Sequence, residues 1–148
     1  RYKPTETEKE TGIEAGKLIL SPTRTYAPVM MNILQTCKDK IHGIIHCTGG
    51  GQTKVLHFID HLRVVKDNMF ETPPVFRLIR EQSGTDWQEM YRVFNMGHRL
   101  ELYLSEKDAL KIIDIADEFK VETKITGRVE KAPKKELVIS GPEGLLKY

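Results

Sequence analysis

Apolar residues recur every three or four positions in three stretches of the chain, which is the spacing of one face of an α-helix. The first stretch covers about residues 25–37, the second follows Pro73-Pro74, and the third runs from Ser105 to about Phe119. Their apolar positions are Tyr26, Val29, Met30, Ile33, Leu34 and Cys37 in the first, Val75, Phe76, Leu78 and Ile79 in the second, and Ala109, Ile112, Ile113 and Ala116 in the third. The pattern predicts three helices that each bury one side.

Signals at the ends of these stretches support the same interpretation. Ser21-Pro22 places a capping serine before a proline, which is typical of a helix start. Ser83-Gly84 is expected to end the second helix. Asp86, with a glutamate three residues later, is an acidic form of the capping box and predicts a further short helix. Another short helix is expected over roughly residues 52–59.

Short runs of apolar and β-branched residues lie between the helices and predict strands. They cover residues 42–47, 61–66, 98–104, 122–129 and 136–140. A predicted helix follows most of the strands, which favours an α/β (α+β) domain with a mixed β-sheet covered by helices over a sandwich or a bundle. The last two strands are expected to be joined through Pro133. The basic cluster there is expected to be a solvated hairpin turn, and its members are Lys131, Lys134 and Lys135.

Residues 1–17 differ from the rest of the chain. They are charged and are interrupted by Pro4, Gly12 and Gly16, so they have little apolar surface to bury. We predict that they form an N-terminal tail or linker and that the folded domain occupies residues 18–148. The chain begins with Arg1 rather than methionine, which indicates a fragment excised from a longer protein.

The charge balance argues against nucleic acid as a partner. The 23 basic and 21 acidic residues give a net charge of +2, and the two signs are interspersed. No apolar run approaches the about 20 residues needed to cross a bilayer, and no signal peptide opens the chain. A cytoplasmic protein with no membrane partner is therefore predicted. Cys37 and Cys47 fall at apolar positions and are expected to be buried, reduced thiols.

Candidate chemistry gathers where a short apolar strand runs into three consecutive glycines. Glycine lets an anion approach the backbone closely and tolerates positive φ, and the first amides of a following helix lack internal partners. Thr48, Gly49, Gly50 and Gly51 are therefore candidates for an anion pocket. The alternative is a tight turn that needs glycine for its shape, because a triple glycine is neither a P-loop nor a Rossmann fingerprint.

Three polar residues near predicted turns each allow two interpretations. His46, directly before the glycine loop, either contacts a substrate as a hydrogen-bonding or acid–base group or is a buried histidine satisfied by the backbone. Asn95 either orients a substrate through its amide or serves its own turn. Arg24, at the entrance of the first helix, either binds an anion or is a surface charge. Two histidine pairs have a spacing that a metal could use, but neither has a third ligand, so no metal site is expected.

Four motifs make the chain similar to a known family. They are Pro22-Thr23-Arg24-Thr25-Tyr26, His46-Cys47-Thr48-Gly49-Gly50-Gly51, Pro73-Pro74-Val75-Phe76 and Phe94-Asn95-Met96-Gly97. Each motif alone is weak, but all four occur in the family's order. The chain resembles the C-terminal domain of aminoimidazole ribonucleotide synthetase, also called phosphoribosylformylglycinamidine cyclo-ligase. It departs from the family pattern at His98-Arg99, so the packing beyond Gly97 is expected to differ.

The resemblance implies an α/β/α layered domain of an ATP-dependent ligase of purine biosynthesis. In this family the formyl oxygen of formylglycinamidine ribonucleotide is phosphorylated, the amidine nitrogen attacks the activated carbon, and phosphate leaves to give aminoimidazole ribonucleotide. ATP and Mg²⁺ are bound mainly by an N-terminal domain, which is absent from this sequence. That domain and a second copy, in a homodimer, are the expected partners, and the fragment alone is expected to be inactive.

The resemblance also implies roles for particular residues. Thr48 to Gly51 match the part of the family that faces the substrate, at its ribose phosphate. His46 and Asn95 match positions that line the same cleft and orient polar groups, and Arg24 matches an arginine that stabilises negative charge. The alternatives are the C-terminal domain of a related ATP-dependent enzyme, of the selenophosphate synthetase or formylglycinamidine synthetase type, and a non-catalytic module that binds a phosphorylated ligand.

Overall fold

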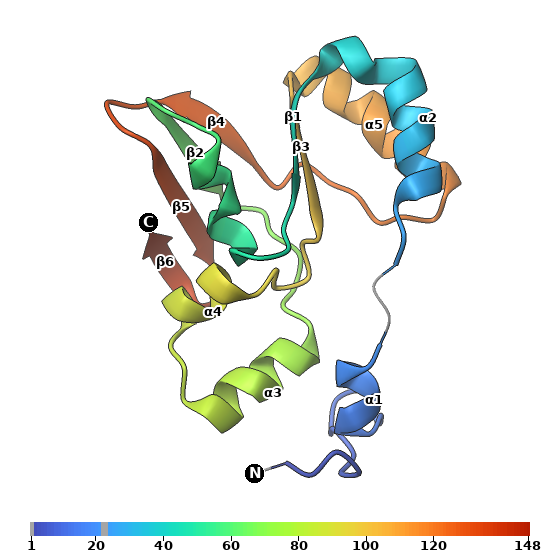
Figure 1. The fold of residues 1–148 in the computed structure, drawn as a ribbon, viewed down its shortest axis with the longest axis vertical. Helices are drawn as coiled ribbons and strands as arrows, with labels where there is room; N and C mark the ends of the chain where they lie inside the picture. Colours follow the sequence, from blue (N-terminus) through green and yellow to red (C-terminus); the bar gives the residue numbers. More distant parts are fainter. Residues whose placement is uncertain (1, 22–23) are drawn as a thin grey trace.

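The computed structural model describes residues 2–21 and 24–148 and shows two β-sheets with helices packed around them (Figure 1). The helices are α1 (Ala15–Ile19), α2 (Ala27–Cys37), η1 (Lys38–Lys40), η2 (Gly51–His57), α3 (Pro74–Ser83), α4 (Trp87–Val93) and α5 (Glu106–Glu118), where η denotes a 3-10 helix. The strands are β1 (Ile41–His46), β2 (Leu62–Lys66), β3 (Leu100–Leu104), β4 (Gly127–Lys131), β5 (Glu136–Gly141) and β6 (Gly144–Lys147). The predicted α+β class is confirmed. In the part of the chain described, no helix is long and apolar enough to span a membrane.

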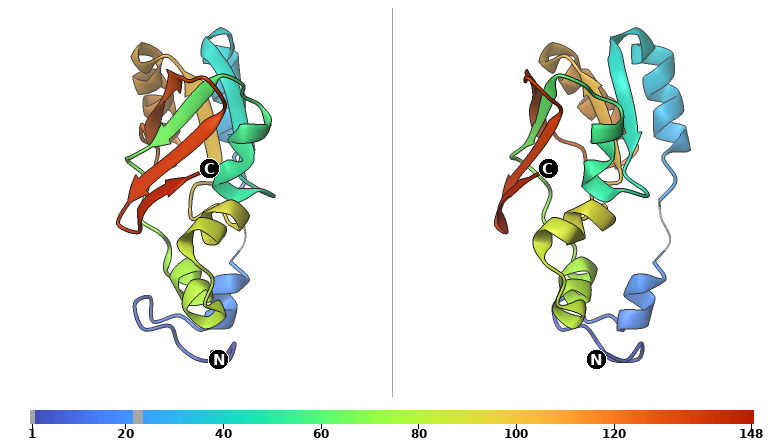
Figure 2. Two further views of the ribbon diagram at one scale, coloured as in Figure 1. Left: turned by 90° about the vertical axis from the view of Figure 1, so that its left-hand side faces the viewer. Right: turned by 60° about the vertical axis from the view of Figure 1, so that its left-hand side comes forward.

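The strands are divided between two sheets, whereas the sequence predicted one. The larger sheet has the order β4-β2-β5-β6 and is mixed, because β2 runs parallel to β5 and antiparallel to β4. The smaller sheet is the antiparallel pair of β1 and β3. From left to right in Figure 1, the layers are the four-stranded sheet, the β1–β3 pair, and the helices α2 and α5. The right-hand view of Figure 2 shows the same order for the larger sheet, the β1–β3 pair and α2.

Strand β3 lies between two groups of buried residues, because both of its faces are covered. Leu102 and Leu104 pack against the helix layer, while Tyr103 packs against the core shared with the larger sheet. Alternate residues of a strand point to opposite faces. The pair β1–β3 therefore serves as a middle layer, although a strand with this alternating pattern is also compatible with one solvated face.

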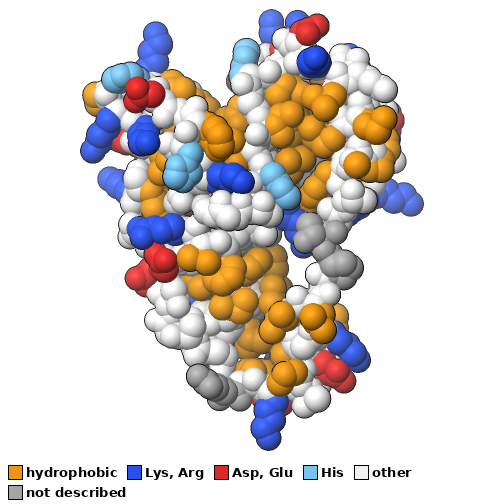
Figure 3. Space-filling view, in the orientation of Figure 1, with side chains coloured by type: hydrophobic (Ala, Val, Ile, Leu, Met, Phe, Trp, Pro, Cys, Tyr) orange, Lys and Arg blue, Asp and Glu red, His pale blue; other side chains and the backbone are white. Residues whose placement is uncertain are grey.

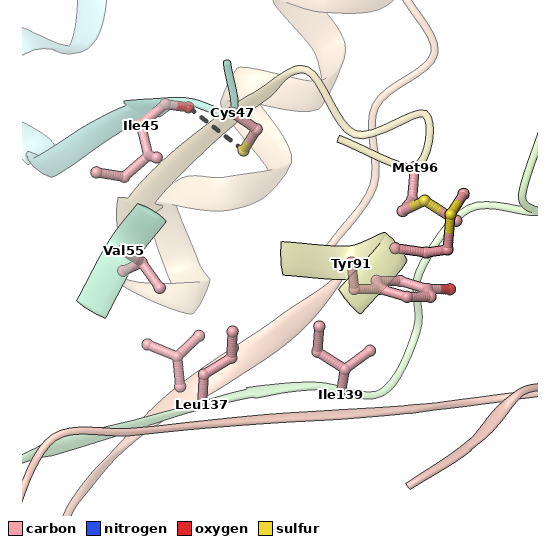
Figure 4. Packing of buried hydrophobic residues seen from close by; sticks show 9 residues of the cluster. Ile45, Cys47, Val55, Tyr91, Met96, Leu137 and Ile139 are labelled. Atoms are coloured by element: carbon pink, nitrogen blue, oxygen red, sulfur yellow. Dashed lines mark hydrogen bonds between the residues drawn. The ribbon is translucent and has the colours of Figure 1, made fainter. Parts of the chain in front are cut away.

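The first core lies between the larger sheet and the elements that carry the glycine loop. Its members converge from β1, η2, α4 and β5, as Figure 4 shows, and they include Ile45, Cys47, Val55, Tyr91, Met96, Leu137 and Ile139. Met90 and Leu137 are completely buried. Burial raises the pKa of the Cys47 thiol to about 12, so this cysteine is a protonated, apolar side chain of the core, as predicted.

The second core joins α2 to α5 and confirms the helical stripes predicted for both, except at Leu34, which is exposed. Val29, Ile33 and Cys37 of α2 are buried against Ile112 and the residues around it in α5. Helix α2 begins at Ala27 with a proline in its first turn, where the missing amide is harmless. Pro22, predicted at the helix start, and Thr23 of the first motif lie outside the described residues.

Helices α3 and α4 start and end where their capping signals predict. Helix α3 begins at Pro74 and is followed by Gly84 in a left-handed conformation, with φ of 71°. Helix α4 is capped by Asp86, whose Oδ1 accepts a hydrogen bond from the Glu89 amide at 2.8 Å. The capping box is thus confirmed in its principal bond.

The C-terminal part of the chain corrects three predictions. Residues 122–126 are not a strand, and β4 begins only at Gly127. In this stretch the carbonyls of Ile125 and Thr126 accept hydrogen bonds from the side chain and the amide of Asn68, so no strand partner is needed. The turn at residues 132–135 is not a hairpin, because β2 lies between β4 and β5. The strand β6 was not predicted.

Residues 2–19 form a compact turn and the short helix α1, which lies beside α3 in Figure 2. The carboxylate of Glu8 accepts hydrogen bonds from the amides of Glu10 and Thr11, and Arg77 of α3 forms an ion pair with Glu10. The segment is thus ordered against the domain, while its role as a tail or linker ending at residue 17 stays a prediction.

Gly51, at the start of η2, lies against the last turn of α4. A methyl group on its Cα would lie 2.5 Å from the Phe94 carbonyl oxygen and 2.6 Å from that of Tyr91, and its φ is +47°. Only a residue without a side chain permits this approach. The contact holds the end of the glycine loop against α4.

Gly51→Ala is therefore expected to lower the free energy of unfolding by about 3 kcal/mol or more, because backbone atoms have to move. Gly84→Ala is the matched control: its φ is also positive, but no atom lies within 4 Å of the added methyl group. The control is expected to lose only about 1 kcal/mol, from backbone strain. Urea unfolding of both variants measures the difference, and equal losses would contradict the close contact.

His98 precedes β3 as a buried imidazole. Its Nε2 accepts a hydrogen bond from the Phe70 amide at 2.8 Å, and its ring lies 4.9 Å from the Phe70 ring. Burial lowers the pKa of His98 to about 4. The folded chain therefore holds this histidine neutral, while the unfolded chain protonates it near pH 6.5.

This difference makes stability depend on pH. Between pH 7 and 5 the unfolded state takes up a proton at His98 that the folded state refuses, so the free energy of unfolding is expected to fall by about 1–2 kcal/mol from this group. His98→Gln keeps an acceptor for the Phe70 amide but does not titrate. Urea unfolding at pH 7, 6 and 5 is expected to show a shallower decline for His98→Gln, and parallel curves would argue against the assignment.

Candidate functional site

The glycine loop follows β1 directly. The Cys47 amide still donates to the Arg99 carbonyl at 2.8 Å, which continues the pairing with the segment before β3. The three residues that follow Thr48 all have positive φ, with 60° at Gly49, 94° at Gly50 and 47° at Gly51. The chain then enters η2. A run of three left-handed residues is open only to glycine, which accounts for the repeat in the sequence.

The amides of Gly49, Gly50 and Gly51 donate no hydrogen bond to any of the described residues. Nearby amides before and after them are engaged, because the Thr48 amide donates to the His46 carbonyl and the Thr53 amide to the Gly50 carbonyl. Unpaired amides at successive left-handed or turn residues form concave sites for anions. The loop is thus equipped to bind a negatively charged group through its backbone.

Polar side chains gather at the same loop. His46 is exposed, and its Nδ1 lies 3.4 Å from the Thr48 hydroxyl. The Lys54 ammonium donates to the Thr48 carbonyl at 2.8 Å. In Figure 3, two histidine side chains flank a basic side chain over the region that η2 occupies in Figure 1. Lys54 was not among the predicted residues, although a lysine one turn after a glycine loop is a recognisable signal for anion binding.

The structure brings Asn95 to the rear of this loop. Its carbonyl accepts a hydrogen bond from the Gln52 side chain at 2.6 Å, and its Oδ1 accepts one from the Gly97 amide at 2.9 Å. The local interpretation of Asn95 as a turn residue is therefore correct for its side-chain oxygen. Contact of its amide nitrogen with a substrate stays a prediction.

Arg24 is engaged elsewhere in the molecule. Its guanidinium donates to the carbonyls of Phe119 and Lys120, both at 2.8 Å. The last carbonyls of a helix lack amide partners and favour a nearby cation, so Arg24 caps α5. The structure thus groups His46, Asn95 and the glycine loop and places the Arg24 guanidinium at the end of α5.

A buried polar network behind the loop was missed from the sequence. Lys66 and Glu101 form an ion pair with side chains 3% and 9% exposed. The Lys66 ammonium also donates to the Gln52 side-chain oxygen at 2.8 Å, and the Tyr103 hydroxyl donates to Glu101 at 2.7 Å. Burial and the negative charge of Glu101 raise the pKa of Tyr103, which keeps the phenol protonated. A lysine that ends the apolar run of β2 was the available signal.

The glycine loop lies on an open surface of this chain. A hollow of about 760 Å³ lies between α2, α5, β3 and the strands β2 and β4, and its lining includes Lys66, His98 and Glu101. That lining does not include residues 46–51. The hollow therefore adjoins the buried network, while Thr48 and Gly49 of the loop are exposed outside it.

The chain is similar to several curated proteins. It is 40% identical to the phosphoribosylformylglycinamidine cyclo-ligase of Methanopyrus kandleri over 112 residues, which cover 76% of this chain and 32% of the relative. It is 34% identical to the enzyme of the same name from Syntrophus aciditrophicus over 140 residues, which cover 87% of this chain and 38% of the relative. The chain thus spans about a third of the length of the relatives it matches.

A solved structure and a family description agree with these relatives. The fold resembles that of E. coli HypE, a hydrogenase maturation protein, with a TM-score of 0.55, 15% identity, and coverage of 84% of this chain and 39% of that one. At this identity the likeness shows the fold alone. Residues 3–140 match the family described as AIR synthase related protein, C-terminal domain. The chain belongs to this family of C-terminal domains of AIR synthase related proteins.

Proposed function

We propose that this chain is the substrate-side, C-terminal domain of an ATP-dependent cyclo-ligase. The whole enzyme converts formylglycinamidine ribonucleotide to aminoimidazole ribonucleotide in de novo purine biosynthesis. Family membership and the shared name of the relatives support this proposal. The observation in the structure that carries it is the run of three left-handed glycines with unengaged amides at the end of β1.

The glycine loop binds the ribose phosphate of the substrate in this proposal. The amides of Gly49, Gly50 and Gly51 donate to phosphate oxygens, and the Thr48 hydroxyl turns toward them from its contact with His46. Lys54, which lies against the Thr48 carbonyl, adds a positive charge at the edge of the loop. Backbone amides and a single cation suit a phosphate, because charge-assisted bonds to an anion are about twice as strong as neutral ones.

The reaction itself needs a phosphoryl group, which ATP supplies to the formyl oxygen. The amidine nitrogen then attacks the activated carbon, and inorganic phosphate leaves with the formyl oxygen. His46 and Asn95 orient the polar groups of the substrate beside the loop, and Arg24 stabilises negative charge if substrate binding releases it from the end of α5. Catalysis of this kind consists mainly of positioning and charge stabilisation.

ATP and Mg²⁺ belong mainly to an N-terminal domain in this proposal. Within residues 2–21 and 24–148, no three carboxylate, histidine or cysteine side chains converge on a common point where a metal could bind. The loop faces outward, so a second domain placed over it would close the site. The partners are therefore this N-terminal domain and, through the whole enzyme, a second copy in a homodimer.

The proposal is tested by joining the two halves of the site. This chain alone is expected to show no ATP-dependent conversion of formylglycinamidine ribonucleotide, and addition of the purified N-terminal domain, or its fusion, is expected to restore formation of aminoimidazole ribonucleotide. The product is measured directly, together with released phosphate. ATP turnover on a different substrate would indicate a related enzyme of the superfamily, and ligand binding without any turnover would indicate a binding module.

The phosphate contact is tested at Gly50, where an added side chain meets only Lys54 at an ordinary 3.6 Å. In the full-length enzyme, Gly50→Asp is expected to raise the KM for formylglycinamidine ribonucleotide at least tenfold, about 1.4 kcal/mol, because it places a negative charge beside the phosphate. The KM for ATP is expected to stay within about twofold.

Gly50→Asn is the matched control, since asparagine has the same shape and tolerates the left-handed conformation equally well. The effect of the added negative charge is the KM for the ribonucleotide in Gly50→Asp divided by that in Gly50→Asn. Equal KM values for Gly50→Asp and Gly50→Asn, or equal losses for the ribonucleotide and ATP, would contradict phosphate binding at this loop.

A further inference from the structure

We propose that Gln52 is a positioning residue that holds the glycine loop in its anion-binding form, and that the buried pair Lys66–Glu101 fixes Gln52. This inference rests on the proposed function, because it assigns the means by which the same loop is kept ready for its ligand. Neither Gln52 nor the ion pair touches the ligand. They act through the position of the residue that ends the loop.

Every polar group of the Gln52 side chain has a partner. The residue is 1% exposed. Its Nε2 donates to the carbonyls of Asn95 at 2.6 Å and His98 at 3.2 Å, and its Oε1 accepts from Lys66 at 2.8 Å. An amide with two donors and one acceptor engaged in a buried site has one orientation available. Gln52 directly follows Gly51 in the chain, so the position of Gln52 sets the position of Gly51, the last residue of the loop.

Lys66 is arranged to hold Gln52 in particular. Its ammonium has three N–H groups, and three acceptors surround it, namely the Gln52 carbonyl, the Gln52 side-chain oxygen and the Glu101 carboxylate. Two of the three bonds therefore go to the residue after the glycines. Glu101 supplies the charge that makes burial of the ammonium tolerable, and Tyr103 satisfies its second oxygen.

Stability alone does not account for this arrangement. A buried ion pair contributes little net stability, since apolar residues of similar volume often make the fold equally stable or more stable. Two methionines in place of Lys66 and Glu101 would fill the space between β2 and β3. They would leave the Gln52 side chain without its charged donor, so its orientation and that of Gly51 would no longer be fixed.

The deciding variant is Lys66→Met/Glu101→Met in the full-length enzyme. The variant is expected to remain folded, with a lower midpoint of thermal unfolding because two oxygens of Gln52 and the Tyr103 hydroxyl lose their buried partners. The KM for formylglycinamidine ribonucleotide is expected to rise about tenfold, while the KM for ATP stays within about twofold. If the ion pair served only the stability of the fold, the folded double variant would have a normal KM for both substrates. An unchanged KM for the ribonucleotide in the folded double variant would overturn the inference.

Arg63→Met/Glu136→Met is the matched control. This pair also joins β2 to a neighbouring strand, with Nε and Oε2 2.8 Å apart, but it makes no bond to the loop. Both KM values are expected to stay at the wild-type level. If the ribonucleotide KM rose as much in this control as in the test variant, the inference would be overturned. Loss of any ion pair on β2 would then be enough to raise that KM.

A second variant covers the case in which the double variant fails to fold. Gln52→Glu keeps the size of the side chain and an acceptor for Lys66, but it turns a carboxylate oxygen toward the carbonyls of Asn95 and His98. A tenfold or larger rise in the ribonucleotide KM alone supports the inference, and an unchanged KM overturns it. If the wild-type enzyme forms no aminoimidazole ribonucleotide, the proposed function itself fails, which is a distinct result.

Discussion

A charge buried between the two sheets organises the part of the fold that carries the glycine loop. Lys66 comes from β2 and Glu101 from β3, and their ion pair is almost completely removed from water. An unpaired charge in that place would cost several kcal/mol, so the strands must meet where the two groups join. The same ammonium binds Gln52. The residue that ends the glycine loop is therefore held by a charge that lies between the two sheets.

Helices were predictable from the sequence because their signals are local, and the sheets were not. The stripe of α2, the capping bond of Asp86 and the glycine that ends α3 all lie within a few residues of the element they define. The division into two sheets depends instead on contacts between distant segments. An alternating strand pattern marks Glu101 as a solvent-facing position, yet its carboxylate faces Lys66 across the interior. Likewise the break at residues 122–126 follows from Asn68, about 57 residues away, which occupies the carbonyl of Ile125.

The candidate site also has one part that could be predicted from the sequence and one part that could not. The backbone conformation of the loop was predictable, because glycine tolerates positive φ, and all three glycines have positive φ. The partners of Arg24 were not, since the carbonyls it caps lie 95 and 96 residues further along the chain. An arginine at a helix entrance is equally suited to an anion and to the end of a neighbouring helix. The packing of α2 on α5 brings Arg24 to the end of α5 in this structure, and its role toward an anion stays a prediction.

The loop combines an open outer half with an anchored inner half. Gly49 has no atom within 4 Å of where a side chain would begin, whereas Gly51 is in close contact with α4 and is followed by the buried Gln52. Three free glycines would lose much backbone entropy on binding, and that loss would weaken any anion complex. Anchoring at Gly51 and Gln52 shifts this ordering into the folding of the domain, so that the amides need little rearrangement when the anion arrives. In the proposed function, the affinity of the exposed half of the loop for phosphate therefore depends on residues that do not touch the phosphate.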